Sequence, residues 1–151
     1  MRVEIVAVGK VKQPQCRALV DEYMGRLKHY LPSGQSEVRE GKGQPNEVMR
    51  QEADALTAAA GASVRVVMDE RGQLLTSAEL AQQLERWMNS GAKQISFIIG
   101  GAAGLEPSLR DSADLLLALS PMTLPHELAR VILSEQLYRA MTIIRGEPYH
   151  K

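Results

Sequence analysis

Short apolar runs alternate with longer stretches of helical periodicity along the chain. The apolar runs are typical of buried strands and fall at 2–8, 63–68, 94–99 and 114–120, with a weaker candidate at 36–40. The stretches with helical spacing fall at 14–29, 47–60, 76–91, 107–112 and 126–142. This alternation predicts an α/β fold, with a mostly parallel sheet covered by helices on both faces. No linker or internal repeat interrupts it, so we expect a single domain over residues 1–151.

Loops beyond the carboxyl ends of parallel strands are the usual place for a ligand. One of them, "IGGAAG", follows the strand candidate at 94–99 and carries Gly100, Gly101 and Gly104. Its spacing is not that of a dinucleotide-binding loop, and no G-K-[ST] follows, so a phosphate-binding P-loop is excluded. A tight strand-to-helix turn and a ligand loop lined by main chain both remain open.

Two further loops occupy strand ends in the second half of the chain, one after Met68 and one after Leu119. The latter, "LSPMTLPHE", is stiffened by Pro121 and Pro125. Prolines pre-order the backbone and so lower the entropy that a ligand-binding loop loses on binding. Pro125 also stands where a helix begins, and ordinary helix punctuation explains it equally well.

Reactive side chains are scarce. The one cysteine, Cys16, allows no internal disulfide, and the three histidines lack metal-ligand spacing, so we expect no metal. The G-x-S-x-G motif of hydrolases is absent. These absences favour a reaction that needs no nucleophile from the protein. Methyl transfer from S-adenosylmethionine is one, because the enzyme only aligns the reactants and helps to remove a proton.

Charge and hydropathy narrow the choice of partners. Lys plus Arg equals Asp plus Glu at 18 each, so binding to nucleic acid would require a local basic patch. No run approaches the roughly 18 apolar residues of a membrane span, and no signal peptide is recognisable, so we expect a soluble cytoplasmic protein.

The helix at 126–142 is apolar on more than one face, which fits either a central core helix or contact with a partner subunit.

The chain resembles the ribosomal RNA large subunit methyltransferase H (RlmH) family of the SPOUT superfamily. Four segments carry the resemblance: "VAVGK", "FIIGGAAGL", "LSPMTLPHELARVILSEQLYRA" and "RGEPYHK". It spans the whole chain and implies a homodimer whose C-terminal part is tied in a deep trefoil knot. It also implies methylation of the imide nitrogen, position 3, of a pseudouridine in 23S ribosomal RNA on the ribosome, with S-adenosylmethionine as donor. A non-catalytic ribosome- or RNA-binding module with the same fold is the alternative.

The resemblance also implies roles for individual residues. The donor would be bound on the three strand-end loops, by Met68, Gly100, Leu119, Ser120, Pro121, Met122, Thr123 and Leu124. Met68 stands where leucine is common, and Pro121 removes one backbone donor at a variable position.

On the acceptor side, the resemblance favours Tyr149 and His150 as substrate-handling catalytic residues and Arg139 as an RNA contact. A frayed terminus without a role is the competing interpretation of the tail. The imide proton needs a base or a polarising group, for which the candidates are His126, Glu135, Tyr149 and His150.

Overall fold

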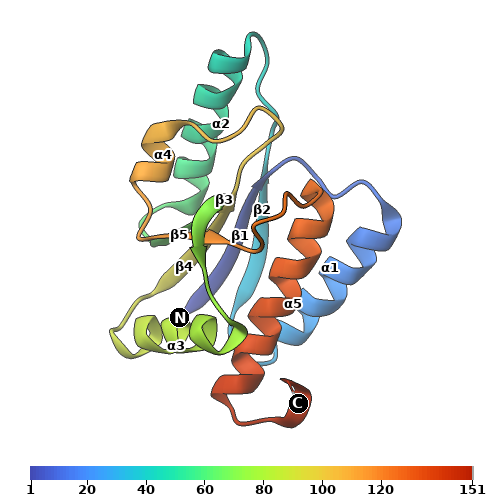
Figure 1. The fold of residues 1–151 in the computed structure, drawn as a ribbon, viewed down its shortest axis with the longest axis vertical. Coiled ribbons are helices and arrows are strands. Elements are labelled where there is room, and N and C mark those ends of the chain that lie inside the picture. Colours follow the sequence, from blue (N-terminus) through green and yellow to red (C-terminus); the bar gives the residue numbers. More distant parts are fainter. Residues whose placement is uncertain (151) are drawn as a thin grey trace.

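The computed structural model describes residues 1–150 and contains one sheet of five parallel strands in the order β2-β1-β4-β3-β5. The strands are β1 (Arg2–Val8), β2 (Ser33–Val38), β3 (Val64–Leu74), β4 (Gln94–Ile99) and β5 (Leu115–Ala118). The helices are α1 (Pro14–Leu27), α2 (Pro45–Ala60), α3 (Ser77–Asn89), α4 (Pro107–Asp111) and α5 (His126–Ile144), followed by the 3-10 helix η1 (Pro148–His150). Figure 1 shows helices on both sides of the sheet, so the predicted α/β architecture is confirmed. Lys151, the last residue of the predicted domain, lies outside the described residues.

Two separate apolar cores occupy the two faces of the sheet. Successive strand residues point to opposite faces, so Ile5 and Phe97 join a core with α1, α3 and α5. Their neighbours Val6 and Ile98 join the other core, with α2 and α4. All four side chains are fully buried. The central strands β1 and β4 are therefore covered on both faces, which explains why their sequences read as continuous apolar runs.

Local signals at the helix ends agree with the predicted boundaries. Thr76 and Glu79 form the expected capping box at the start of α3, with Glu79 N–H donating to Thr76 Oγ1 at 3.1 Å. Gly61 and Gly91 follow α2 and α3 with positive φ angles of 60° and 84°. Helix α5 continues to Ile144, two residues beyond the expected end.

Two strands differ from their predictions. The weak candidate at 36–40 is observed as β2 at Ser33–Val38, a polar edge strand in which Ser36 Oγ donates to Glu4 Oε1 at 2.9 Å. Its polar residues form hydrogen bonds instead of an apolar stripe, so hydropathy gives a poor signal. The expected loop at 69–75 is in part strand, because β3 bulges after Met68 and then pairs with β5 again at Gln73.

The bulge in β3 requires a glycine at its return point. A Cβ on Gly72 would lie 2.6 Å from the backbone of Leu116 in β5, too close for any side chain. The bulge therefore projects Asp69 and its neighbours beyond the sheet without ending the strand. The trefoil knot implied by the resemblance is not defined by strand order and stays a prediction. Within residues 1–150 no helix is both long and apolar enough to cross a membrane.

Candidate functional site

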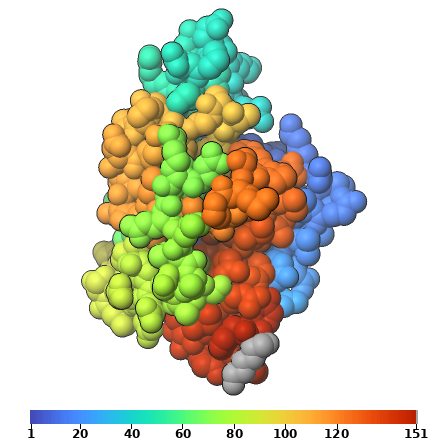
Figure 2. Space-filling model, in the orientation of Figure 1, coloured from blue at the N-terminus to red at the C-terminus, as the bar shows by residue number. Residues whose placement is uncertain are grey.

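A cavity of about 430 Å³, called here the loop cavity, lies at the carboxyl ends of β3, β4 and β5. Its walls are the β3 bulge, the glycine loop after β4 and the proline loop before α5, which meet on the face seen in Figure 2. Most of the predicted donor-binding residues line it: Met68, Gly100, Leu119, Ser120, Met122, Thr123 and Leu124. Pro121 does not. The structure thus brings the three predicted loops together, whereas their ligand stays a prediction.

The glycine loop is both a tight turn and a cavity wall, so the two open interpretations of "IGGAAG" describe one feature. Gly104 N–H donates to Gly101 O at 3.0 Å, and Gly104 has a φ of 92°. A Cβ on Gly100 would lie 2.7 Å from Leu105 Cδ2. Glycine is needed there because Leu105 packs directly against the main chain. The cavity is consequently lined by backbone on this side, and by both apolar and polar side chains elsewhere.

The proline loop is held in place by its own polar groups. Thr123 Oγ1 donates to Glu70 Oε2 at 2.6 Å, which joins this loop to the β3 bulge. Ser120 Oγ accepts the Met122 N–H at 3.0 Å. These hydrogen bonds, together with Pro121 and Pro125, leave the loop little freedom to lose when a ligand binds.

Asp69 places a negative charge at the edge of the loop cavity. Burial by itself raises the pKa of this carboxyl group, but the Arg71 N–H, at 2.8 Å, and the guanidinium groups of Arg71 and Arg110 lower it below the usual value. Arg110 Nε lies 2.9 Å from Asp69 Oδ2, an ion-pair contact without the alignment of a hydrogen bond. Asp69 is therefore ionised at neutral pH, and its charge is already balanced by the two guanidinium groups of Arg71 and Arg110.

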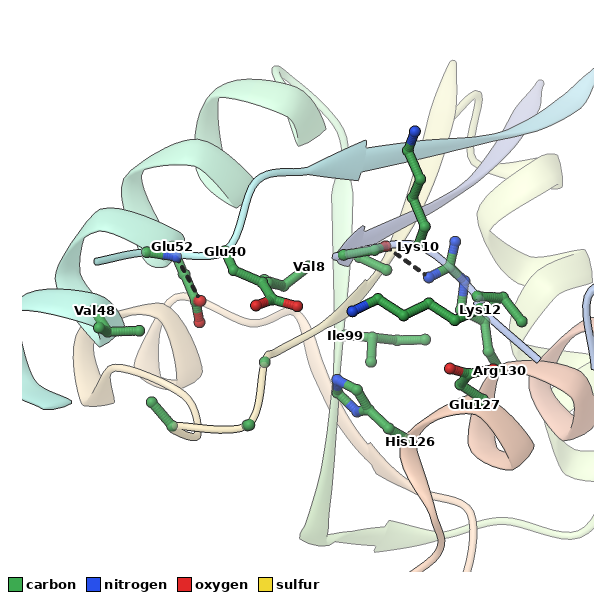
Figure 3. A pocket seen from close by; sticks show the side chains of 17 residues that line it. Val8, Lys10, Lys12, Glu40, Val48, Glu52, Ile99, His126, Glu127 and Arg130 are labelled. Carbon is green, nitrogen blue, oxygen red and sulfur yellow. Dashed lines mark hydrogen bonds between the residues drawn. The ribbon is translucent and has the colours of Figure 1, made fainter. Parts of the chain in front are cut away.

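A second cavity of about 330 Å³, called here the lysine cavity, lies at the carboxyl end of β1 (Figure 3). The exposed Lys10 and Lys12 stand at one side of it, and Glu40 and Glu52 at the other. Ile99, Gly101, Ala102 and His126 line both cavities, so the two share a wall. Sequence reasoning missed this cavity; the available signal was the basic "VGK" immediately after the first strand.

His126 occupies the junction of the two cavities. It is the first residue of α5, follows Pro125 directly and is exposed. Proline fixes the entry angle of the helix and so fixes the position of this side chain on the shared wall. Of the candidate bases, His126 alone lines either cavity within residues 1–150.

The tail residues lie at the other end of α5. This helix has 19 residues and is about 28 Å long, which separates the tail from the cavities in one chain. Tyr149 donates its hydroxyl to Glu135 Oε2 at 3.0 Å and packs edge-on against Tyr138, with 4.6 Å between the ring centroids. These contacts tie the tail to α5 instead of leaving it frayed, whereas His150 is exposed.

Arg139 belongs to the same cluster as Tyr149. Its Nη2 lies 2.8 Å from Glu135 Oε2, and its guanidinium stands 4.9 Å from the centroid of the Tyr149 ring. Burial, together with the hydrogen bond to Glu135, raises the pKa of Tyr149 to about 12. Tyr149 is therefore a hydrogen-bond donor at neutral pH and not a base in this arrangement. Whether Arg139 contacts RNA stays a prediction.

Asp69→Asn is expected to lower stability at neutral pH by roughly 1–2 kcal/mol, because the neutral amide cannot replace the charged contacts with Arg71 and Arg110. The folded-state pKa of Asp69 is depressed, so its stabilising effect is complete above the unfolded value of about 3.9 and is lost as pH falls through the folded pKa. Urea unfolding at pH 7 and pH 3 tests this, with the exposed Glu85→Gln as control. A difference between wild type and variant that does not shrink in acid would contradict it.

The comparisons with known proteins agree with this geometry. Residues 1–150 match the family model described as "Predicted SPOUT methyltransferase". Relatives named "Ribosomal RNA large subunit methyltransferase H" from Syntrophobacter fumaroxidans and Sorangium cellulosum are 44% and 46% identical, covering 100% and 99% of both chains respectively. A solved structure of a probable methylase family protein from Haemophilus influenzae has a TM-score of 0.57 at 12% identity, over 99% of this chain and 70% of that one, and supports the fold alone. The resemblance is confirmed: the chain belongs to the SPOUT methyltransferase family.

Proposed function

We propose that the protein transfers a methyl group from S-adenosylmethionine to the imide nitrogen, position 3, of a pseudouridine in 23S ribosomal RNA on the ribosome. The observation that carries this is the convergence of three strand-end loops on one cavity, beside a second cavity of about 330 Å³. The family and the name of its full-length relatives support the same reaction. A ribosomal substrate implies that the protein acts in the cytoplasm.

The loop cavity suits the donor in size and in lining. About 430 Å³ lies within the roughly 300–1,000 Å³ of small-molecule and cofactor sites. Met68, Gly100 and the proline loop would hold the donor with apolar side chains and main chain. Once bound, the donor supplies its methyl group: a bond forms between this carbon and N3 as the carbon–sulfur bond breaks, its electron pair passing to sulfur and the imide proton to a base.

His126 is the base that the geometry favours. His126 lines both the loop cavity and the lysine cavity. A pseudouridine ring in the lysine cavity would therefore present its imide N–H near this imidazole. Glu135 is bound to Arg139 and Tyr149 at the far end of α5. The raised pKa of Tyr149 argues against proton abstraction by that residue.

A homodimer would bring the tail of one subunit to the cavities of the other. Helices α1 and α5 begin side by side, since the Gln13 N–H donates to Glu127 Oε1 at 2.9 Å. Their first two turns expose Leu19, Leu128 and Ile132, which are 44%, 45% and 37% exposed. Neighbouring exposed apolar side chains near a cavity suit a subunit interface. In that dimer, Tyr149 and His150 would contact the substrate, and Arg139 the RNA backbone.

Binding of the donor is tested with Gly100→Val, whose added side chain would collide with Leu105. S-adenosylmethionine at a hundred times its Kd should stabilise the wild-type protein by about 2.7 kcal/mol, seen as a higher Tm, and the variant should lose most of that shift. Gly25→Val is the matched control, because no atom lies within 4 Å of a Cβ built there. Equal shifts in both variants would refute the placement, and no shift in wild type would refute the donor.

The reaction is tested by incubating ribosomes that lack the modification with labelled donor and mapping the product nucleoside by mass. We expect N3-methylpseudouridine from wild type and a loss of roughly 10²–10⁴ in kcat for His126→Ala, with donor affinity changed only a few-fold. The exposed His29→Ala serves as control. Ribosome binding without transfer by wild type would favour the non-catalytic RNA-binding module, and a fully active His126→Ala would exclude His126 as base.

The subunit arrangement is tested by mixing two inactive variants, one lacking residues 149–151 and one carrying Gly100→Val. If the tail serves the partner's cavity, a mixed dimer has one intact cavity facing one intact tail, and roughly a quarter to a half of the wild-type rate should return. Each variant alone should remain inactive. A monomer in sedimentation at micromolar concentration, or no recovery in a mixture shown to contain mixed dimers, would contradict the arrangement.

A further inference from the structure

The lysine cavity contains a buried carboxyl oxygen that the steps above leave unused. Glu52 on α2 is 4% exposed and lines this cavity. Its Oε2 accepts the Gly41 N–H at 2.9 Å, whereas its Oε1 has no hydrogen-bond partner among residues 1–150. A buried polar atom without a partner is costly, and most such atoms in proteins are paired. A ligand with an N–H or O–H donor would supply the missing partner.

The unpaired oxygen points to the wall that the two cavities share. A Cβ built on Gly101 would lie 2.6 Å from Glu52 Oε1, so this oxygen faces the bare main chain of the glycine loop. Gly101 lines both cavities. In Figure 3, Glu52 lies on the α2 side of the lysine cavity, with His126 and the α5 residue Arg130 on the other. A flat ring bound between Glu52 and His126 would contact Glu52 at one edge. Another edge of the ring would face the loop cavity.

The opposite side of the lysine cavity carries both signs of charge: Lys10 and Lys12 stand there with Glu127, and the Arg130 guanidinium is paired with Glu37. Lys10 and Lys12 are exposed at its mouth, and Arg130 Nε is buried without a hydrogen-bond partner among the described residues. A ligand of the lysine cavity should therefore combine a neutral group that donates a hydrogen bond with a nearby anion. A nucleotide of an RNA chain has both, a base with ring N–H groups and a phosphate on either side.

We infer that Glu52 Oε1 accepts the N1–H of the target base and so selects pseudouridine over uridine, an inference that rests on the proposed function. Pseudouridine is joined to ribose through C5, so its N1 carries a hydrogen, whereas N1 of uridine carries the ribose. N1 and N3 flank the same carbonyl carbon. A ring whose N1–H meets Glu52 can thus turn N3 towards His126 and the loop cavity. Uridine would place a C–H group against Glu52 and leave the oxygen unpaired.

Glu52→Gln is the direct test because glutamine has one carbonyl oxygen for two N–H donors, Gly41 and N1. We compare single-turnover rates on ribosomes carrying pseudouridine or uridine at the target position. Wild type should prefer pseudouridine, and the variant should lose roughly ten- to a hundredfold on pseudouridine while its rate on uridine stays the same. Glu47→Gln, on the exposed side of the same helix, changes the charge equally and should keep the wild-type preference.

Measurements that do not depend on methyl transfer separate recognition of the base from folding of the variant. The Tm and donor affinity of Glu52→Gln should match wild type, and binding to the two kinds of ribosome with S-adenosylhomocysteine present should lose its preference for pseudouridine. If Glu52→Gln fails to fold, Gly101→Ala covers the same oxygen without removing the carboxyl group, and it should reduce the same preference.

The outcomes also separate this inference from the proposed function. The role of Glu52 would be overturned, with the methyl transfer intact, if wild type prefers neither pseudouridine nor uridine. The same holds if a folded Glu52→Gln keeps the preference, or loses activity equally on both nucleosides. A wild type that binds donor but methylates neither kind of ribosome would overturn the proposed function itself.

Discussion

The carboxyl edge of the sheet depends on one buried guanidinium. Arg130 is 5% exposed, and its Nη1 donates to Gly9 O at 3.1 Å at the end of β1. Its Nη2 donates to Gln35 Oε1 at 3.2 Å and forms an ion pair with Glu37, both in β2. The N-terminal part of α5 is thereby fixed to the ends of two strands far away in sequence. A buried ion pair contributes little net stability, but loss of one partner would leave the other charge buried and unpaired where both cavities open.

With that edge fixed, the remaining polar side chains serve mainly to hold main chain in position. Thr123 is bound to Glu70, Ser120 closes its own loop, and Asp69 joins the β3 bulge to α4 through Arg110. None of these groups is arranged as an activated nucleophile. This agrees with the proposed reaction, in which the methyl donor is already activated and the protein contributes alignment and one proton acceptor.

The sequence predicted those parts of the structure that follow from local rules. Periodicity located the strands, the Thr76–Glu79 spacing located the start of α3, and the order of elements placed three loops at one edge of the sheet. Strand β2 was placed poorly because an edge strand with paired polar groups carries no apolar pattern. The bulge in β3 depends on renewed pairing with β5, a contact across more than forty residues.

The lysine cavity was beyond sequence reasoning for a similar reason. Its walls come from separate segments around residues 8–12, 40–41, 48–52, 99–103 and 126–130, which only the tertiary fold brings together. Glu52 reads in the sequence as an ordinary solvated helix residue, and only its burial and its unpaired oxygen distinguish it. The position of the tail also needs the tertiary fold: Tyr149 is close to α5 in sequence, yet the length of α5 separates it from the cavities in the same chain.

The balance of charge then limits how such a protein can recognise RNA. With 18 basic and 18 acidic residues, the chain has no general attraction for a polyanion, so non-specific binding should be weak. The basic groups near the proposed acceptor site are few: Lys10 and Lys12 at the cavity mouth, and Arg139 near the tail. In the proposed dimer, affinity for RNA would therefore come from contacts that fit one shape, with the small basic regions of both subunits combined. A folded ribosomal surface offers such a shape, and an extended RNA strand does not, which is why the proposed substrate is the assembled particle.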